Sequence, residues 1–148
     1  MSPLRHAARL VVLDGQGAVL LVKYNDGRPG RPAHYWSTPG GGVESGETHV
    51  AAAQRELVEE TGLEAAVGRE LWSCRVRLDL PSSGVVEQLE RYFLVRIAEV
   101  APDVRNSSPE DIVGHRWWTV ADLKTTTDLV FPDGLVASLA EAGLDGTG

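Results

Sequence analysis

Two continuous apolar runs near the amino terminus constrain the fold more than any other feature of this 148-residue chain. Residues 9–13 and 18–24 are rich in Val and Leu, and an Asp-Gly-Gln-Gly segment separates them. Asp and Gly favour turn conformations between strands, and strands without polar alternation are typical of sheets covered on both faces. The pattern predicts a β-hairpin, Arg9–Leu13 with Ala18–Tyr24, that other layers of structure bury from both sides.

The rest of the chain alternates between strand and helix patterns. This order predicts one domain, residues 1–148, with an α/β (α+β) fold in which helices pack on a mixed sheet. A segment rich in Gly, Pro and Arg at 25–34 predicts an exposed loop, and the tail from about 142 to 148 is expected to fray. The other expected elements are strands within 65–80, 89–100 and 112–120, and helices at 48–61, 120–124 and 132–141.

The charge balance limits the partners of the protein. A formal net charge of −7 leaves no basic field for the phosphates of a nucleic-acid polymer, so none is expected as the main partner. No run approaches the ~20 apolar residues that cross a bilayer, so no membrane partner is expected either. Cys74 is the only cysteine, which excludes an internal disulfide and suits a reducing, cytoplasmic location. An acidic protein can still hold phosphates through a divalent cation.

Residues 48–61 carry the strongest helix signal. Thr48 is a good N-cap, three consecutive alanines follow, and Gly62 is a suitable stop. The helical spacing predicts a buried stripe and, opposite to it, a face exposed to water. The predicted buried stripe comprises Val50, Ala53, Leu57 and Thr61.

Three carboxylates gather on one side of this helix. Glu59 and Glu60 lie three and four positions after Glu56, and like charges at such spacings destabilise a helix by about 0.2–0.5 kcal/mol per pair. They also lie in its second half, where the helix dipole disfavours anions. A hard cation such as Mg²⁺ or Mn²⁺ prefers carboxylate oxygens and resolves the repulsion. The alternative interpretation is a solvated acidic face.

The surrounding residues distinguish these two interpretations, because residues 41–63 resemble the box of the Nudix (MutT-like) hydrolases, G-x5-E-x7-R-E-U-x-E-E-x-G-U, where U is a bulky aliphatic residue. The preceding Trp-Ser-Thr-Pro-Gly-Gly segment is also similar to the usual lead-in of the family. The resemblance implies a Nudix αβα sandwich with a mixed central sheet and a loop–helix–loop box. The fixed positions are met by Gly41, Glu47, Arg55, Glu56, Leu57, Glu59, Glu60, Gly62 and Leu63.

The same resemblance implies an enzyme that uses Mg²⁺, with Mn²⁺ as a substitute, to cut a pyrophosphate bond. Its substrate would be a nucleoside diphosphate linked to another moiety, as in nucleotide sugars, ADP-ribose or nucleoside triphosphates. Glu56, Glu59 and Glu60 would be catalytic metal ligands, with the Gly41 carbonyl as a further ligand. Metal ions would lower the pKa of a bound water that attacks phosphorus, so no protein nucleophile is needed.

The residues themselves suggest supporting roles around these ligands. Glu47 and Arg55 are expected to pair across the loop and the helix, and so to orient the metal ligands. The run of glycines would let the backbone approach a metal or a diphosphate closely, and it comprises Gly40, Gly41 and Gly42. Arg31 and Tyr35, in the preceding loop, are candidates for contact with the phosphate or the base of the substrate.

The general base is left open between Glu59 and a glutamate outside the box. Relatives often carry a glutamate shortly before the Trp of an Arg-Trp strand, but this chain has Gly114 and His115 there. His115 is either a general base or a structural residue. Trp117 and Trp118 face opposite sides of a strand, so one of them could stack on a nucleobase, although packing of both in the core is also expected. The outside candidates are Glu110, Glu87 and Glu90.

Two other functions are compatible with the same fold. A sensor that binds a nucleotide such as ADP-ribose without cutting it is disfavoured, because such relatives are expected to lose box glutamates and this chain keeps them. Action on capped or triphosphate-ended RNA is disfavoured by the acidic charge. Because members of the family often dimerise, a homodimer is also possible.

Overall fold

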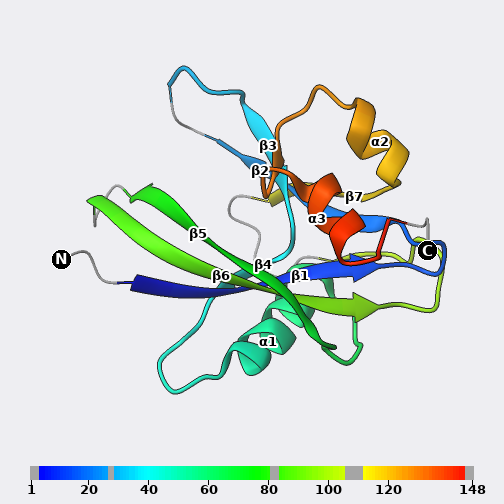
Figure 1. The fold of residues 1–148 in the computed structure, drawn as a ribbon, viewed down its shortest axis with the longest axis horizontal. Helices are drawn as coiled ribbons and strands as arrows, with labels where there is room; N and C mark the ends of the chain where they lie inside the picture. The colour runs from blue at the N-terminus through cyan, green and yellow to red at the C-terminus, as the bar shows by residue number, and fades with distance from the viewer. Residues whose placement is uncertain (1–3, 27–28, 81–83, 106–111, 146–148) are drawn as a thin grey trace.

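The computed structural model describes residues 4–26, 29–80, 84–105 and 112–145. Over these residues the chain forms one curled mixed sheet and three helices (Figure 1). In chain order the elements are β1 (Leu4–Leu13), β2 (Val19–Asn25), β3 (His34–Ser37), β4 (Gly40–Gly42), α1 (His49–Thr61), β5 (Glu70–Leu80), β6 (Gly84–Arg96), β7 (Ile112–Trp118), α2 (Val120–Thr125), β8 (Val130–Phe131) and α3 (Leu135–Glu141).

The predicted hairpin exists, but its two strands separate soon after the turn. β1 and β2 pair antiparallel at Leu13 and Val19. Beyond that point β1 pairs in parallel with β6 along its whole length and antiparallel with β4, whereas β2 pairs with β3 and β7. The sheet order is β5-β6-β1-β2-β3-β8, with β4 on β1 and β7 on β2. The separation lets the glycine strand β4 lie beside β1.

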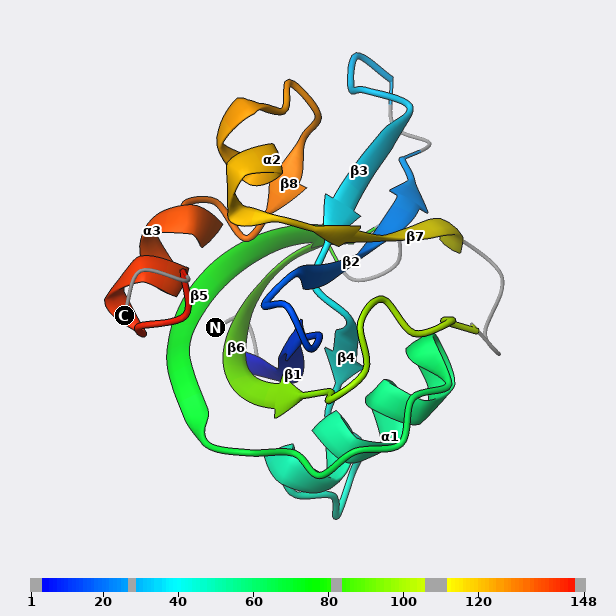
Figure 2. The ribbon, with the colours of Figure 1, turned by 90° about the vertical axis from the view of Figure 1, so that its right-hand side faces the viewer.

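Both faces of the sheet are covered, as the apolar runs predicted. Along β1, Leu10 and Val12 lie in the core under α1, whereas Val11 and Leu13 lie in the core that contains Leu123 of α2 and side chains of α3. Figure 2 shows the curled sheet between α1 on one side and α2 and α3 on the other. The expected mixed sheet with helices on both faces is therefore confirmed.

Helix α1 begins and ends as predicted, but the face that it buries is different. The Thr48 hydroxyl accepts a hydrogen bond from Ala51 N–H, and Gly62 ends the helix in the left-handed conformation that favours glycine. Val50 is 50% exposed, so its place in the buried stripe was wrong. Glu56 and Glu60 are buried, which contradicts the alternative interpretation of a solvated acidic face.

Short elements were missed where tertiary pairing makes the strand. β4 consists only of glycines, which have low intrinsic strand preference, and it is a strand because it pairs with Ala7–Arg9 of β1. β3 pairs with β2 on one side and with β8 on the other. In the tail expected to fray, Leu144 is 6% exposed and packs in the core beside α3, and residues 146–148 lie outside the described part.

Cys74 is a free thiol whose pKa is raised by burial, which agrees with a packing role. Within the described residues no helix has the length and apolar character needed to cross a bilayer.

Asp14 gives a test of how the β1–β2 turn is held. Its carboxylate is 7% exposed and accepts hydrogen bonds from the backbone N–H groups of Gln16, Ala18 and Ala101, each at 2.9 Å. Burial alone would raise the pKa of Asp14, but these backbone donors outweigh it and lower the pKa. We therefore expect Asp14→Asn to lower the free energy of unfolding by about 1–3 kcal/mol at neutral pH.

Because the pKa of Asp14 is lower in the folded protein, this contribution is present above about pH 4 and is lost as the pH falls further. Urea unfolding at pH 7 and at pH 3 measures both expectations, and the difference between the two proteins should shrink at pH 3. An equal difference at both pH values would contradict the role given to the ionised carboxylate.

Candidate active site

The box glutamates meet the glycine strand where α1 packs against β4. The Glu60 carboxylate accepts a hydrogen bond from Gly40 N–H at 2.8 Å and one from the Tyr24 hydroxyl at 3.2 Å. Glu56 approaches the same strand so closely that a Cβ atom on Gly41 would lie 2.6 Å from Glu56 Oε1. The absence of a side chain at Gly41 is therefore what makes room for this carboxylate.

Burial makes it costly to keep this pair of carboxylates ionised. Loss of solvent, followed by the neighbouring charge of Glu56, raises the pKa of Glu60 to about 7, although Gly40 N–H opposes the rise. Burial also raises the pKa of Glu56. Two acids on adjacent helical turns, both withdrawn from water, lose their mutual repulsion when a cation joins them.

Arg55 connects the helix to the loop that precedes it. Its guanidinium forms a bidentate pair with Glu47, with Nε and Nη2 each 2.9 Å from a Glu47 oxygen, so the expected pairing is present. Nη1 also donates to Glu56 at 2.8 Å and to Glu59 at 3.3 Å, and Nη2 donates to the Gly42 carbonyl at 3.0 Å. The hydrogen bond from Arg55 lowers the pKa of Glu47 to about 2. One cation thus holds three glutamates and the glycine strand together.

A second arginine, on β1, supports the glycine strand β4, and sequence reasoning missed it. Arg9 of β1 donates to Glu90 at 3.0 Å, to the Gly40 carbonyl at 3.3 Å and to the Thr38 carbonyl at 3.4 Å. Glu90 is 7% exposed and also accepts from the Gln88 amide and the Tyr92 hydroxyl. A charged residue inside a buried apolar strand was the available signal, because such a charge needs a buried partner.

The structure distinguishes the candidates for the general base. The contacts of Glu90 make it part of the support of Gly40, not a group that reaches a bound water. Glu87 is exposed and pairs with Arg75 at 3.4 Å, and Glu110 lies outside the described residues. Glu59 has a side chain that is 44% exposed, so among the box glutamates of α1 it is the one most open to water.

His115 lies beside the same site. Its side chain hydrogen-bonds the main-chain carbonyl of Glu60, and burial lowers its pKa. Its Nε2 atom is buried and has no hydrogen-bond partner within the described part of the chain. The two tryptophans of β7 serve packing, because Trp118 is 1% exposed and Trp117 packs against the core and donates to the Pro102 carbonyl.

The two loop residues proposed to contact substrate differ in their relation to the site. Arg31 lies in an exposed turn. The ring of Tyr35 stacks on that of Tyr24, with centroids 5.4 Å apart, and meets Phe131 edge-on at 5.6 Å. Since Tyr24 binds Glu60, Tyr35 is connected to the site through one intervening ring.

The donor set fits a hard divalent cation. Within the described residues, no three His, Cys, Asp or Glu side chains lie close enough together to hold a metal by themselves. Glu56 and Glu60 nevertheless place buried carboxylate oxygens beside the Gly41 backbone, and this combination of oxygen ligands suits Mg²⁺ or Mn²⁺. Arg55 holds Glu56 and Glu59 in this conformation. The metal-ligand roles stay a prediction.

Two neighbouring glycines provide a matched test of this arrangement. In Gly41→Ala the new methyl group would collide with Glu56, whereas in Gly42→Ala it would meet only Arg5 Nη2, at 3.8 Å. We expect Gly41→Ala to weaken Mn²⁺ binding by about tenfold or more and Gly42→Ala to change it by less than about twofold. Calorimetric titration with Mn²⁺ measures this. Equal affinities for the two variants would show that the position of Glu56 against Gly41 does not matter for metal binding.

Comparison with known proteins identifies the family of this chain. The family model described as NUDIX domain matches residues 3–138. An RNA pyrophosphohydrolase of Pelagibacter ubique is 29% identical over 138 residues, which cover 86% of this chain and 82% of that protein. An RNA pyrophosphohydrolase of Yersinia pestis is 34% identical over 120 residues, which cover 73% of this chain but only 65% of that protein.

Solved structures show the same fold. The crystal structure of the MutT protein from Methanosarcina mazei Go1 superposes with a TM-score of 0.69 over 99% of this chain and 98% of that chain, at 19% identity. The match to the family model, the intact box and the shared fold together confirm the recognition and the enzyme class expected from the sequence: the chain belongs to the NUDIX family of hydrolases.

Proposed function

We propose that this protein is a divalent-metal-dependent hydrolase that cuts a pyrophosphate bond in a small nucleotide substrate, in which a nucleoside diphosphate is linked to another group. The observation that carries the proposal is the burial of Glu56 and Glu60 against a strand of three glycines. A site of this kind offers anionic oxygens to a cation, and the missing side chain of Gly41 lets the Glu56 carboxylate lie against the backbone.

The side chains of the site have different roles. Glu56, Glu59, Glu60 and the Gly41 carbonyl would hold Mg²⁺ or Mn²⁺, which supplies neutralisation of the diphosphate charge and a bound water of lowered pKa. Arg55 orients Glu56 and Glu59 from one side.

The remaining contacts position Glu60, and a separate carboxylate accepts the proton. Gly40 N–H and the Tyr24 hydroxyl fix the Glu60 carboxylate in position. Because solvent reaches Glu59 more readily than the other two acids, we assign to its carboxylate the proton of the attacking water.

Triphosphate-ended RNA is a second candidate substrate. The curated relatives named above are RNA pyrophosphohydrolases, which favours it. The net charge of −7 argues against a surface that binds a long polyanion. Small nucleotides are therefore the first candidates, and a short oligonucleotide with a 5′-triphosphate belongs in the same assay.

Hydrolysis in the presence of Mg²⁺ tests the proposal directly. The panel comprises nucleoside triphosphates, nucleotide sugars, dinucleoside polyphosphates, ADP-ribose and the triphosphate-ended oligonucleotide, and the products are separated and identified by ion-exchange chromatography. We expect at least one member to be cut with Mg²⁺ and none with EDTA. Tight binding of a nucleotide without hydrolysis would instead indicate a sensor.

An amide substitution tests the assigned metal ligand. Glu60→Gln keeps the shape of the side chain but removes its charge, so we expect kcat to fall by about 100-fold or more. Glu64→Gln is the matched control, because Glu64 is exposed just beyond the end of α1, and it should keep full activity. Thermal unfolding of both variants checks that the fold is intact. If Glu60→Gln retained its rate, the metal-site assignment would be wrong.

A further inference from the structure

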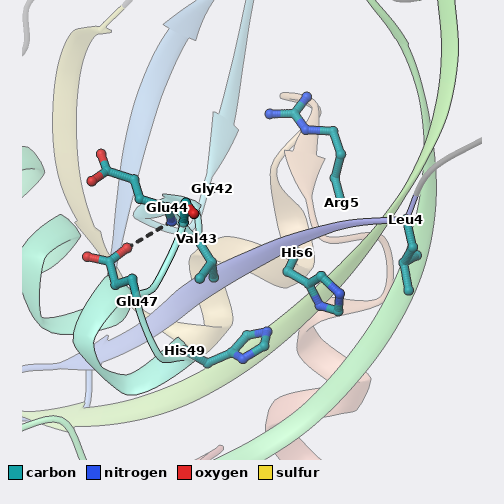
Figure 3. A pocket seen from close by; sticks show the side chains of 9 residues that line it. Leu4, Arg5, His6, Gly42, Val43, Glu44, Glu47 and His49 are labelled. Carbon is teal, nitrogen blue, oxygen red and sulfur yellow. Dashed lines mark hydrogen bonds between the residues drawn. The ribbon is translucent and has the colours of Figure 1, made fainter.

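Arg9 contacts the glycine strand from the face of β1 that is opposite to α1. Side chains along a strand alternate between its two faces. Figure 3, a close view of the cavity beside β4, shows Arg5 and His6 on opposite sides of β1, with His6 beside His49 of α1. Arg9 has the same alternation as Arg5, whereas the next residue, Leu10, lies in the core under α1. Arg9 therefore holds β4 from the side that α1 does not cover.

The guanidinium of Arg9 holds two carbonyls of the chain that enters β4. Its Nη1 atom lies 3.4 Å from the Thr38 carbonyl and 3.3 Å from the Gly40 carbonyl. A Cβ atom on Gly40 would lie 2.8 Å from Arg9 Cδ and 2.3 Å from the Ala8 carbonyl. The stem of Arg9 thus packs against β4 at a position where only glycine leaves room for it.

The peptide between those two carbonyls holds the proposed metal ligand Glu60. Its carbonyl, that of Pro39, accepts a hydrogen bond from Leu10 N–H at 2.9 Å, and its N–H, that of Gly40, donates to the Glu60 carboxylate at 2.8 Å. Rotation of this peptide would turn the N–H away from the carboxylate. Arg9 restricts such a rotation because it holds the carbonyl on either side.

The charge of Arg9 also acts on the same carboxylate. Burial raises the pKa of Glu60, and the hydrogen bond from Gly40 N–H and the charge of Arg9 both oppose this rise. Arg9 therefore favours the ionised form of Glu60 in addition to fixing the backbone beside it.

A buried polar cluster on β6 fixes Arg9 in this position. Arg9 Nε donates to Glu90 at 3.0 Å, and Glu90 also accepts from the Gln88 amide at 2.9 Å and from the Tyr92 hydroxyl at 3.2 Å. A buried ion pair is often no more stabilising than apolar side chains of the same volume. Stability alone therefore gives little reason for this cluster, whereas the positioning of β4 gives one.

We propose that Arg9 is a positioning residue of the active site, which holds the carbonyls of Thr38 and Gly40 and so fixes the backbone N–H that orients the Glu60 carboxylate. Its effect on the reaction passes through Gly40 and Glu60, and Glu90 contributes only by holding Arg9. The effect on the rate rests on the proposed function, whereas the effect on Gly40 N–H does not.

The test removes both charges of the buried pair together, because loss of Arg9 alone would leave Glu90 buried without its partner. The paired variant, Arg9→Met with Glu90→Gln, nearly keeps the side-chain volumes and leaves an acceptor for the neighbours of Glu90. The control is Arg116→Met with Asp122→Asn, which removes an ion pair of 3.2 Å between β7 and α2 whose side chains are both 45% exposed. Thermal unfolding should show that both proteins are folded.

Hydrogen exchange in the metal-free protein measures the positioning directly. We expect the Gly40 amide to exchange at least about tenfold faster in the paired variant than in the wild type, because its peptide is free to turn. Val43 N–H, which donates to the His6 carbonyl at 2.8 Å just after β4, should change by less than about threefold, and the control variant should change neither amide. Unchanged exchange at Gly40, or equal acceleration of both amides, would overturn the proposal.

A single substitution serves if the paired variant does not fold. Arg9→Lys keeps the charge beside Glu90, but one ammonium nitrogen cannot occupy the positions of both Nε and Nη1. We expect the Gly40 amide to exchange faster in this variant as well, with Val43 N–H unchanged. Wild-type exchange at Gly40 would show that a positive charge is enough and would contradict the positioning role.

Kinetics distinguishes positioning from general support of the fold. With Mg²⁺ and any substrate that is cut, the paired variant should lose about tenfold or more in kcat, with KM changed by less than about threefold. The control variant should keep both values. An equal loss in the control, or an unchanged kcat in the paired variant, would overturn the proposal.

Glu90→Gln alone tests whether Glu90 takes part in the chemistry. Arg9 keeps its two carbonyls in this variant, so kcat should fall by less than about threefold. A loss as large as that of the paired variant, with Gly40 exchange unchanged, would assign Glu90 to the reaction and overturn the proposal. If no substrate is cut by the wild type, the proposed function fails, and hydrogen exchange at Gly40 alone decides whether Arg9 fixes that peptide.

Discussion

The burial of Glu56 and Glu60 against a strand without side chains is the constraint on which the whole site depends. Burying carboxylates is costly unless each oxygen finds a donor or a cation. Here Gly40 N–H, Tyr24 and Arg55 provide the donors. This arrangement holds the acids in place before any metal binds, and it makes a cation the natural partner for their remaining charge.

Two arginines connect this site to the rest of the molecule. Arg55 ties the helix to its preceding loop through Glu47 and Gly42, and Arg9 ties Gly40 to Glu90 in the sheet. Removing one partner of a buried pair such as Arg9 with Glu90 typically costs about 3–5 kcal/mol. The glycine strand therefore has a fixed position although its own residues favour no particular conformation. The site is rigid because its cations are shared between elements that are distant in sequence.

Much of this arrangement could be predicted from local sequence. The cap at Thr48, the stop at Gly62 and the pairing of Glu47 with Arg55 depend on residues that are close along the chain, and the structure has all three. The buried stripe of α1 was placed wrongly at Val50, because hydrophobicity alone selects apolar residues for the core. Glu60 is buried because Gly40 of β4 offers it a backbone donor, and Glu56 is buried because Gly41 leaves room for it. Helical periodicity cannot reveal either contact.

The sequence by itself determined the family, the layered fold and the cluster of acids, because nine box positions and two apolar strands encode them locally. Only the tertiary structure decided which acids are buried and that Arg9 and Glu90 support Gly40. Those contacts join residues from β1, β4, β6 and α1. Their geometry depends on how the curled sheet brings these elements together, and residue spacing carries no information about that.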